Sequence, residues 1–160
     1  MKEHIKYIVF TGAVLLFIST QSLPIDIFVE GDWNLTINET DLQSGAGSDL
    51  NSNYSSASDV TLISVDNSTK TWEIQVSKTD VNWHSSLHLY VRRTGTGTYD
   101  TDPPTGGTSY QEITGTNTYF WEAADGVQDV PHQFQLTGVS ITVPPDIYDV
   151  DVTFTVVETE

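Results

Sequence analysis

The chain of 160 residues has the length of one domain, and it contains no cysteine, which excludes disulfides and thiol chemistry. Its 22 Asp and Glu residues against 6 Lys and Arg residues give a formal net charge of −16. Because such a charge repels phosphate backbones and anionic lipid headgroups, the composition argues against nucleic acid as a partner.

The first 22 residues predict a signal peptide. Lys2 and Lys6 precede an apolar run over 7–18, and a small or polar stretch over 19–22 follows it. A helix that crosses a bilayer needs roughly 20 apolar residues, so cleavage after Ser22 is favoured over an uncleaved anchor, which is the alternative. The mature protein is therefore expected to be secreted or at the cell surface, with membrane contact only through the leader during export.

Apolar and polar residues alternate directly after the leader, which predicts an N-terminal strand over 23–37 with Gly31 as a bulge. The apolar positions are Ile25, Ile27 and Val29, followed by Trp33, Leu35 and Ile37. Two roles are open for this strand. It pairs within its own domain as strand A, or Ile25, Ile27 and Val29 are donated to the sheet edge of another copy, where a new strand satisfies unpaired hydrogen bonds.

Residues 38–58 are rich in Ser, Asn, Gly and Asp, and we interpret them as a flexible polar loop. N-x-S/T sequences occur in this loop and on both sides of it. They begin at Asn34, Asn38, Asn53 and Asn67. If the host glycosylates its exported proteins, these asparagines are candidate glycosylation sites.

Residues 59–160 predict the body of an all-β domain, because the alternation has the period of strands and no segment has helical spacing. The predicted strands are 60–65, 71–77, 86–93, 109–114, 118–122, 132–136 and 148–156, with 140–143 as a short addition. In the last strand, Val150, Val152 and Phe154 share the inner face and Asp149 and Asp151 the outer one. Turn residues between the segments favour an immunoglobulin-like antiparallel β-sandwich of about 7–9 strands, connected as a Greek key.

The sequence contains few groups that are arranged for catalysis or metal binding. His84 and His88 would lie about 13 Å apart in a strand, too far for one metal ion, so we expect no zinc site. Asp146, Asp149 and Asp151 cluster near one turn and make calcium the one candidate cofactor. Neither G-x-S-x-G nor H-E-x-x-H occurs, and no catalytic residue is assigned; the protein is expected not to be an enzyme.

Four tryptophans supply an alternative function, a secreted carbohydrate-binding module, because an exposed aromatic face can stack on a sugar. Trp33 and Trp72 begin alternating segments and are expected in the core. Trp83 and Trp121 are the expected exposed residues and hence the candidate carbohydrate-binding pair.

The ending over 134–156, FQLTGVSITVPPDIYDVDVTFTV, resembles the closing hairpin of the spore coat U and archaic chaperone-usher pilin family. It departs from that family in having no disulfide near its start and Pro145-Asp146-Ile147 in place of a Gly before the final aromatic residue. The resemblance implies an incomplete immunoglobulin-like sandwich that accepts an N-terminal strand from the next subunit. The expected function is thus a structural or adhesive surface subunit, pilin-like or matrix-like, whose partners are copies of itself or related subunits.

Overall fold

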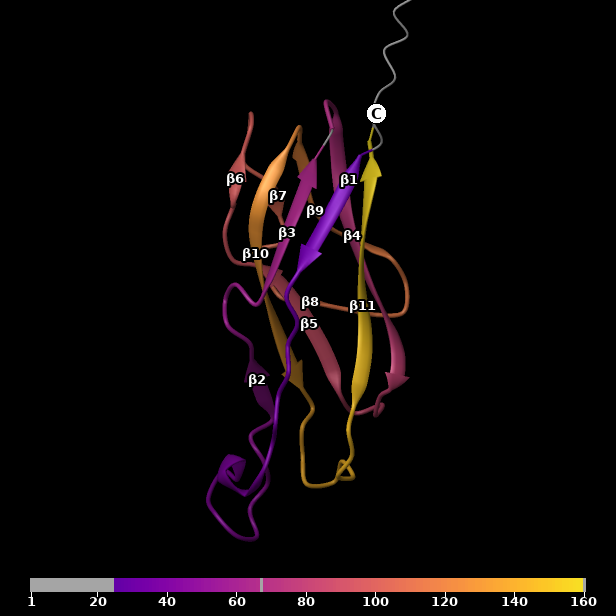
Figure 1. Ribbon diagram of the computed structural model, residues 1–160. Helices are drawn as coiled ribbons and strands as arrows, with labels where there is room; N and C mark the ends of the chain where they lie inside the picture. Colours follow the sequence, from indigo (N-terminus) through magenta and orange to yellow (C-terminus); the bar gives the residue numbers. More distant parts are fainter. Residues whose placement is uncertain (1–24, 67, 160) are drawn as a thin grey trace, which may run out of the picture.

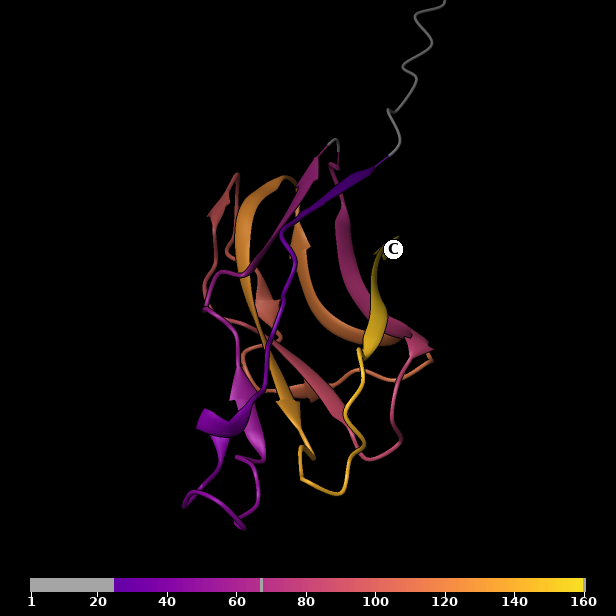
Figure 2. The same ribbon diagram turned by 60° about the horizontal axis from the view of Figure 1, so that its bottom comes forward.

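The computed structural model describes residues 25–66 and 68–159, which form two antiparallel β-sheets packed face to face (Figures 1 and 2). The predicted signal peptide and Asn67 lie outside the described residues. The first sheet has the order β1 (Asp26–Glu30), β3 (Thr61–Asp66), β10 (Val127–Thr137), β5 (His88–Arg93) and β8 (Gln111–Glu112), and β2 (Asn53–Ser55) and β6 (Thr98–Tyr99) also pair with β10. The second sheet has the order β11 (Asp149–Glu158), β4 (Thr71–Asn82), β9 (Thr118–Ala124) and β7 (Thr105–Gly106).

From β3 onwards, the long strands alternate between the two sheets: β3, β5 and β10 lie in the first sheet, and β4, β9 and β11 in the second. The predicted all-β sandwich is therefore confirmed. Its immunoglobulin-like strand order is not confirmed. With β1 counted as the first long strand, the sixth, β10, lies between the second, β3, and the fourth, β5. In the immunoglobulin order, the fifth strand lies between the second and the fourth. β10 and β11 lie in different sheets and therefore do not form a hairpin with each other.

The core lies between the sheets and comes from the strands whose alternation the sequence shows. In β4, Trp72, Ile74 and Val76 are completely buried, whereas the residues between them are half-buried. In β11, Val150 and Phe154 pack against this core, as predicted, but remain partly exposed because β11 is an edge strand. The core cluster consists of Ile63, Val65, Trp72, Ile74, Val76, Leu89, Val91, Ile113, Phe120, Trp121, Ala123, Val127, Val130 and Phe134.

A β-bulge in β9 changes which residues face the core. The register between β4 and β9 shifts between the pairs Ile74↔Trp121 and Gln75↔Tyr119, so that Phe120 is the extra residue. A bulge places two successive residues on one face of the sheet. Both Phe120 and Trp121 are consequently buried, and Trp72 packs edge-on against Trp121 with ring centroids 5.4 Å apart.

The predicted N-terminal strand is shorter than expected. β1 ends at Glu30, and Gly31 follows with a φ of +97°, where an added Cβ would lie 2.1 Å from the carbonyl oxygen of Val60. Residues 32–38 run on without strand pairing, so the predicted strand over 33–37 is wrong. Trp33 nevertheless anchors this segment, because its ring stacks on Phe134 at 6.5 Å between centroids.

The polar segment 38–58 contains more local structure than predicted. A 3-10 helix, Glu39–Asp41, begins at Asn38, whose side chain accepts a hydrogen bond from the Thr40 amide. Leu42 and Leu50 form an isolated bridge, and β2 joins the first sheet through β10. Elsewhere, the predicted strand over 140–143 is a turn, and that over 109–114 is reduced to β8.

The described chain begins and ends at the same end of the sandwich. β1 starts opposite the end of β3, and β11 ends opposite the start of β4 (Figure 1). The segments 38–52, 83–87 and 138–148 lie at the other end. Within the described residues, no helix is long and apolar enough to span a membrane.

Candidate functional site

The two sheets end beside one another on one side of the sandwich. Among the described strands, β1 pairs only with β3, and β11 pairs only with β4. β1 contacts β11, and the two strands diverge from the shared end of the sandwich (Figure 1). We call this side the open edge, and define it by β1 and β11. The edge strand of a sheet can pair with a further strand, which makes the open edge one place where a strand can add; β8 and β7 end the two sheets on the other side.

Of the predicted interaction residues, Ile27 and Val29 lie in β1 at this edge, and Ile25 directly precedes the strand. Ile25 and Ile27 are half-buried and pack against the core. Val29 is opposite Ile63 in the register but remains 46% exposed, and Phe28 on the other face is 52% exposed. Ile25 and the first half of β1 therefore pack against the core, and the second half of β1 lies at the surface.

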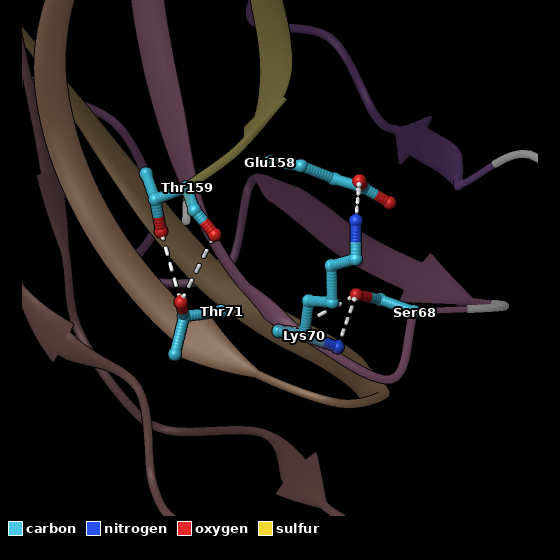
Figure 3. Close-up of polar contacts among 5 residues, drawn as sticks. All are labelled: Ser68, Lys70, Thr71, Glu158 and Thr159. Atoms are coloured by element: carbon cyan, nitrogen blue, oxygen red, sulfur yellow. Dashed lines mark hydrogen bonds and ion pairs between the residues drawn. The ribbon is translucent and has the colours of Figure 1, made fainter.

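β11 is anchored much more strongly than β1. Its ten residues pair with β4 along their whole length, and the chain beyond it is fastened to the start of β4 (Figure 3). The Thr159 amide donates to the Thr71 carbonyl at 2.9 Å, and the two threonine hydroxyls are 3.0 Å apart. Next to them, Lys70 Nζ forms an ion pair with Glu158 Oε2 at 2.9 Å. Of the two edge strands, β1 is thus the one that can detach at lower cost.

Where β11 ends beside the start of β4, we expect the Lys70–Glu158 ion pair to contribute less to stability than the backbone pairing does. Both side chains are well exposed, 64% for Lys70 and 43% for Glu158, and exposed ion pairs contribute little in water. We expect Lys70→Gln to lower the free energy of unfolding by less than about 0.5 kcal/mol. Urea unfolding at 0.05 M and 0.5 M NaCl measures this, and a loss above about 1 kcal/mol would show that the ion pair anchors β11.

The structure separates the two tryptophans that were predicted to bind carbohydrate. Trp121 is completely buried, so its predicted exposure is wrong, and the bulge at Phe120 is the reason. Trp83 is half-buried just after β4, at the end of the sandwich opposite the start of β1. Its Nε1 donates to the carbonyl of Leu87 at 2.9 Å, and the Lys78 ammonium lies 5.2 Å from the ring centroid.

The residues considered for metal binding do not converge. Nδ1 of His88 contacts Glu112 Oε1 at 2.6 Å, whereas the Nδ1 atom of His84 accepts the Ser86 amide. One carboxylate oxygen of Asp146 accepts the Ile147 amide, and Asp149 and Asp151 point to solvent from β11. In the described part of the chain, no three His, Asp or Glu side chains are close enough to hold a metal ion, so the structure does not support the calcium hypothesis.

The candidate glycosylation sites within the described residues are Asn34, Asn38 and Asn53, and all three are exposed. The Thr40 hydroxyl, the third residue of the sequence that begins at Asn38, donates to Asn38 Oδ1 at 2.9 Å. Glycosylation at these positions stays a prediction.

Arg93 is a buried residue with a structural role that the sequence did not indicate. It is 6% exposed and donates to the carbonyl oxygens of Gly95, Pro104 and Gly106 at 2.7–3.0 Å. No carboxylate among the described residues forms an ion pair with it. Burial lowers the pKa of its guanidinium. Arg93 thus holds the loop 95–106 to the sandwich by charge-assisted hydrogen bonds.

His132, at the centre of β10, is the second group that was missed. It is completely buried, and its ring lies between Trp121, Phe120 and Phe154 at centroid distances of 5.6–6.0 Å. Within the described residues, neither ring nitrogen has a hydrogen-bond partner. Burial lowers the pKa of His132 to about 3 and the charge of Arg93 acts in the same direction, although the carbonyls of Val130 and Thr61 oppose the shift. In the sequence, the signal for the burial of His132 was its position in an alternating strand.

No protein-family model, curated protein or solved structure matches this chain. The site must therefore be interpreted from its own geometry.

Proposed function

We propose that this protein is an exported, non-enzymatic subunit of a surface or extracellular assembly, structural or adhesive and pilin-like or matrix-like, that joins copies of itself through β1. The observation that carries the proposal is that β1 is a short edge strand, paired with β3 alone among the described strands, whose second half lies at the surface. The leader predicted over 1–22 supports export.

The energetics of β1 favour exchange between copies. Burying an isoleucine side chain completely stabilises a fold by about 1.5–3 kcal/mol, and Ile25 and Ile27 are only half-buried. When β1 leaves its own sheet and enters the same place in a neighbour, each lost contact is made again. The exchange therefore costs little, provided that the connecting chain can change direction.

The chain after β1 supplies such a connection. Gly31 adopts a conformation that other residues rarely adopt, and residues 32–38 are free of strand pairing. Trp33 stays fixed on Phe134, so the movement is confined to residues before it. A short segment reaches only an adjacent copy. Exchange in both directions between two copies closes a dimer, whereas exchange in one direction adds further copies.

The net charge sets the conditions for assembly. At −16, copies repel one another at low ionic strength, and the repulsion is screened within about 8 Å at 0.15 M salt. Assembly is therefore tested at physiological salt or above.

The test compares the mature protein, beginning at Leu23, with a form beginning at Asp32 that lacks β1. We expect the mature protein to form oligomers and the shortened form to remain a folded monomer that binds a peptide of residues 23–31. Light scattering coupled to size-exclusion chromatography measures the mass, and fluorescence anisotropy of the labelled peptide measures binding.

The matched control is the same peptide with Ile27→Asp, which places a charge where Ile27 packs against the core and should abolish binding. If the mature protein is a monomer at every salt concentration, or if the shortened form does not fold, β1 is an ordinary strand of its own domain and the proposal is wrong.

A further inference from the structure

A hollow of about 250 Å³ lies between the second half of β4, the segment 83–88 and the segment 112–115. We call it the Trp83 hollow; its lining includes Lys78, Asp80, Trp83, His88, Glu112 and Ile113. These residues come from β4, β5 and β8 and from the chain next to them, so the hollow bridges the two sheets. It is separate from the open edge and takes no part in the proposed exchange of β1.

The apolar part of the hollow is held in a fixed position. The hydrogen bond from Trp83 Nε1 to the Leu87 carbonyl orients the indole, and the indole also packs against the core. Ile113 is completely buried and the Lys78 ammonium lies 5.2 Å from the indole centroid, so the apolar surface left to a ligand is the exposed part of Trp83. A binding wall that is already ordered loses little side-chain entropy when a ligand arrives.

The polar part of the hollow includes one ion pair and one hydrogen-bonded histidine–glutamate contact. Glu112 is paired with His88 at 2.6 Å, and Asp80 is paired with Lys78. The side chains of His88, Glu112 and Asp80 are between 42% and 54% exposed, so they remain accessible to a ligand. Because each of these carboxylates has a cationic or hydrogen-bonding partner, the hollow offers hydrogen-bonding groups without a large uncompensated charge.

We propose that the Trp83 hollow binds one neutral sugar unit of a glycan. A pyranose ring has an apolar face that suits the exposed part of the Trp83 indole, and a rim of hydroxyl groups that suits the carboxylates of Asp80 and Glu112. The hollow is small and open to solvent, so it would contact one ring of a longer chain without enclosing it. An anionic sugar would meet the net charge of −16 and is disfavoured.

The binding test uses the mature protein and defined hexasaccharides of glucose, mannose, xylose and N-acetylglucosamine, with hexagalacturonate as the anionic comparison. We expect at least one neutral hexasaccharide to bind with a Kd on the order of 0.1–1 mM, as befits a small contact area, and hexagalacturonate not to bind. Isothermal titration calorimetry measures the binding. The second readout is the NMR signal of the Trp83 indole N–H, which is assigned because it is lost in Trp83→Phe.

Three variants locate the binding. We expect Trp83→Ala to weaken it at least 10-fold and Glu112→Gln, at a well-exposed side chain that is safe for folding, to weaken it 3- to 10-fold. Tyr99→Ala is the matched control, because it removes an exposed aromatic ring in β6 at the other end of the sandwich and should leave the Kd unchanged. Near-ultraviolet circular dichroism confirms that each variant is folded.

The proposal is overturned if no neutral hexasaccharide binds saturably, if hexagalacturonate binds as well as the neutral sugars, or if Glu112→Gln and folded Trp83→Ala both keep the wild-type Kd. The form that begins at Asp32 should bind the sugar as well as the mature protein does. The outcome is therefore independent of whether β1 mediates assembly.

Discussion

Replacing Arg93 by methionine is expected to lower the free energy of unfolding by about 3 kcal/mol and the Tm by roughly 10 °C. Hydrogen bonds from a charged donor contribute about 1.5–3 kcal/mol, and this guanidinium donates to three carbonyl oxygens. Methionine fills a similar space but donates nothing, so Pro104 and Gly106 lose a partner for their carbonyls. Arg93→Lys should recover only part of the loss, because one ammonium cannot reach all three acceptors.

Arg92 provides the matched control one residue away. It is half-buried, and its Nε and Nη2 atoms donate to the same oxygen of Gln133 at 3.0 and 2.8 Å. Arg92→Met removes these bonds and the contact with the Tyr110 ring, and should cost about 1 kcal/mol. Urea unfolding gives both values, and hydrogen exchange should show faster opening of residues 95–106 only in the Arg93 variant. Equal losses in the two variants would contradict the anchoring role.

Replacing His132 by leucine is expected to remove a large part of the loss of stability at acid pH. The pKa of His132 is lowered to about 3 in the folded protein, against about 6.5 in the unfolded chain. Below pH 6.5 the unfolded chain therefore binds a proton that the folded protein refuses, and the stability present above that pH is lost progressively as the pH falls towards 3. Each pH unit in this window costs about 1.4 kcal/mol, or about 2 kcal/mol in total at pH 5.

The measurement is the difference in unfolding free energy between His132→Leu and wild type from pH 7.5 to pH 5. Protonation of the many carboxylates affects both proteins and cancels in this difference. At pH 7.5 the two proteins should be close in stability, because leucine replaces a ring whose nitrogens have no partner within the described residues. The exposed His88→Gln variant controls for the loss of a histidine as such. Curves that run parallel across the pH range would show that His132 does not limit acid stability.

The strands that alternate strictly were the parts of the fold that could be predicted. β3, β4, β5, β10 and β11 lie within a few residues of the predicted segments, and the inner face of β11 is correct. Prediction failed where alternation was present without a partner strand, as over 33–37, or where a bulge interrupted it, as at Phe120. The pairing partner and the bulge are set by another strand, and no local pattern contains that information.

The candidate sites likewise contain some features that the sequence indicated and others that it could not indicate. The sequence indicated β1 and Trp83, since one is an alternating segment after the leader and the other a tryptophan beside a strand end. It could not show that Trp121 is buried, nor that Lys78, Glu112 and Trp83 share one hollow. Residues from three strands meet there only after the sheets have packed.

By itself, the sequence determined the all-β class, the inward-facing side chains of β11, the absence of thiol chemistry and the strongly negative charge. Only the tertiary structure decided the strand order, the position of the open edge, the burial of Arg93 and His132, and the separation of Trp83 from Trp121. The physical reason is the separation along the chain of the residues that interact. Alternation and charge are properties of neighbouring residues, whereas strand order and burial depend on contacts between residues far apart in the chain.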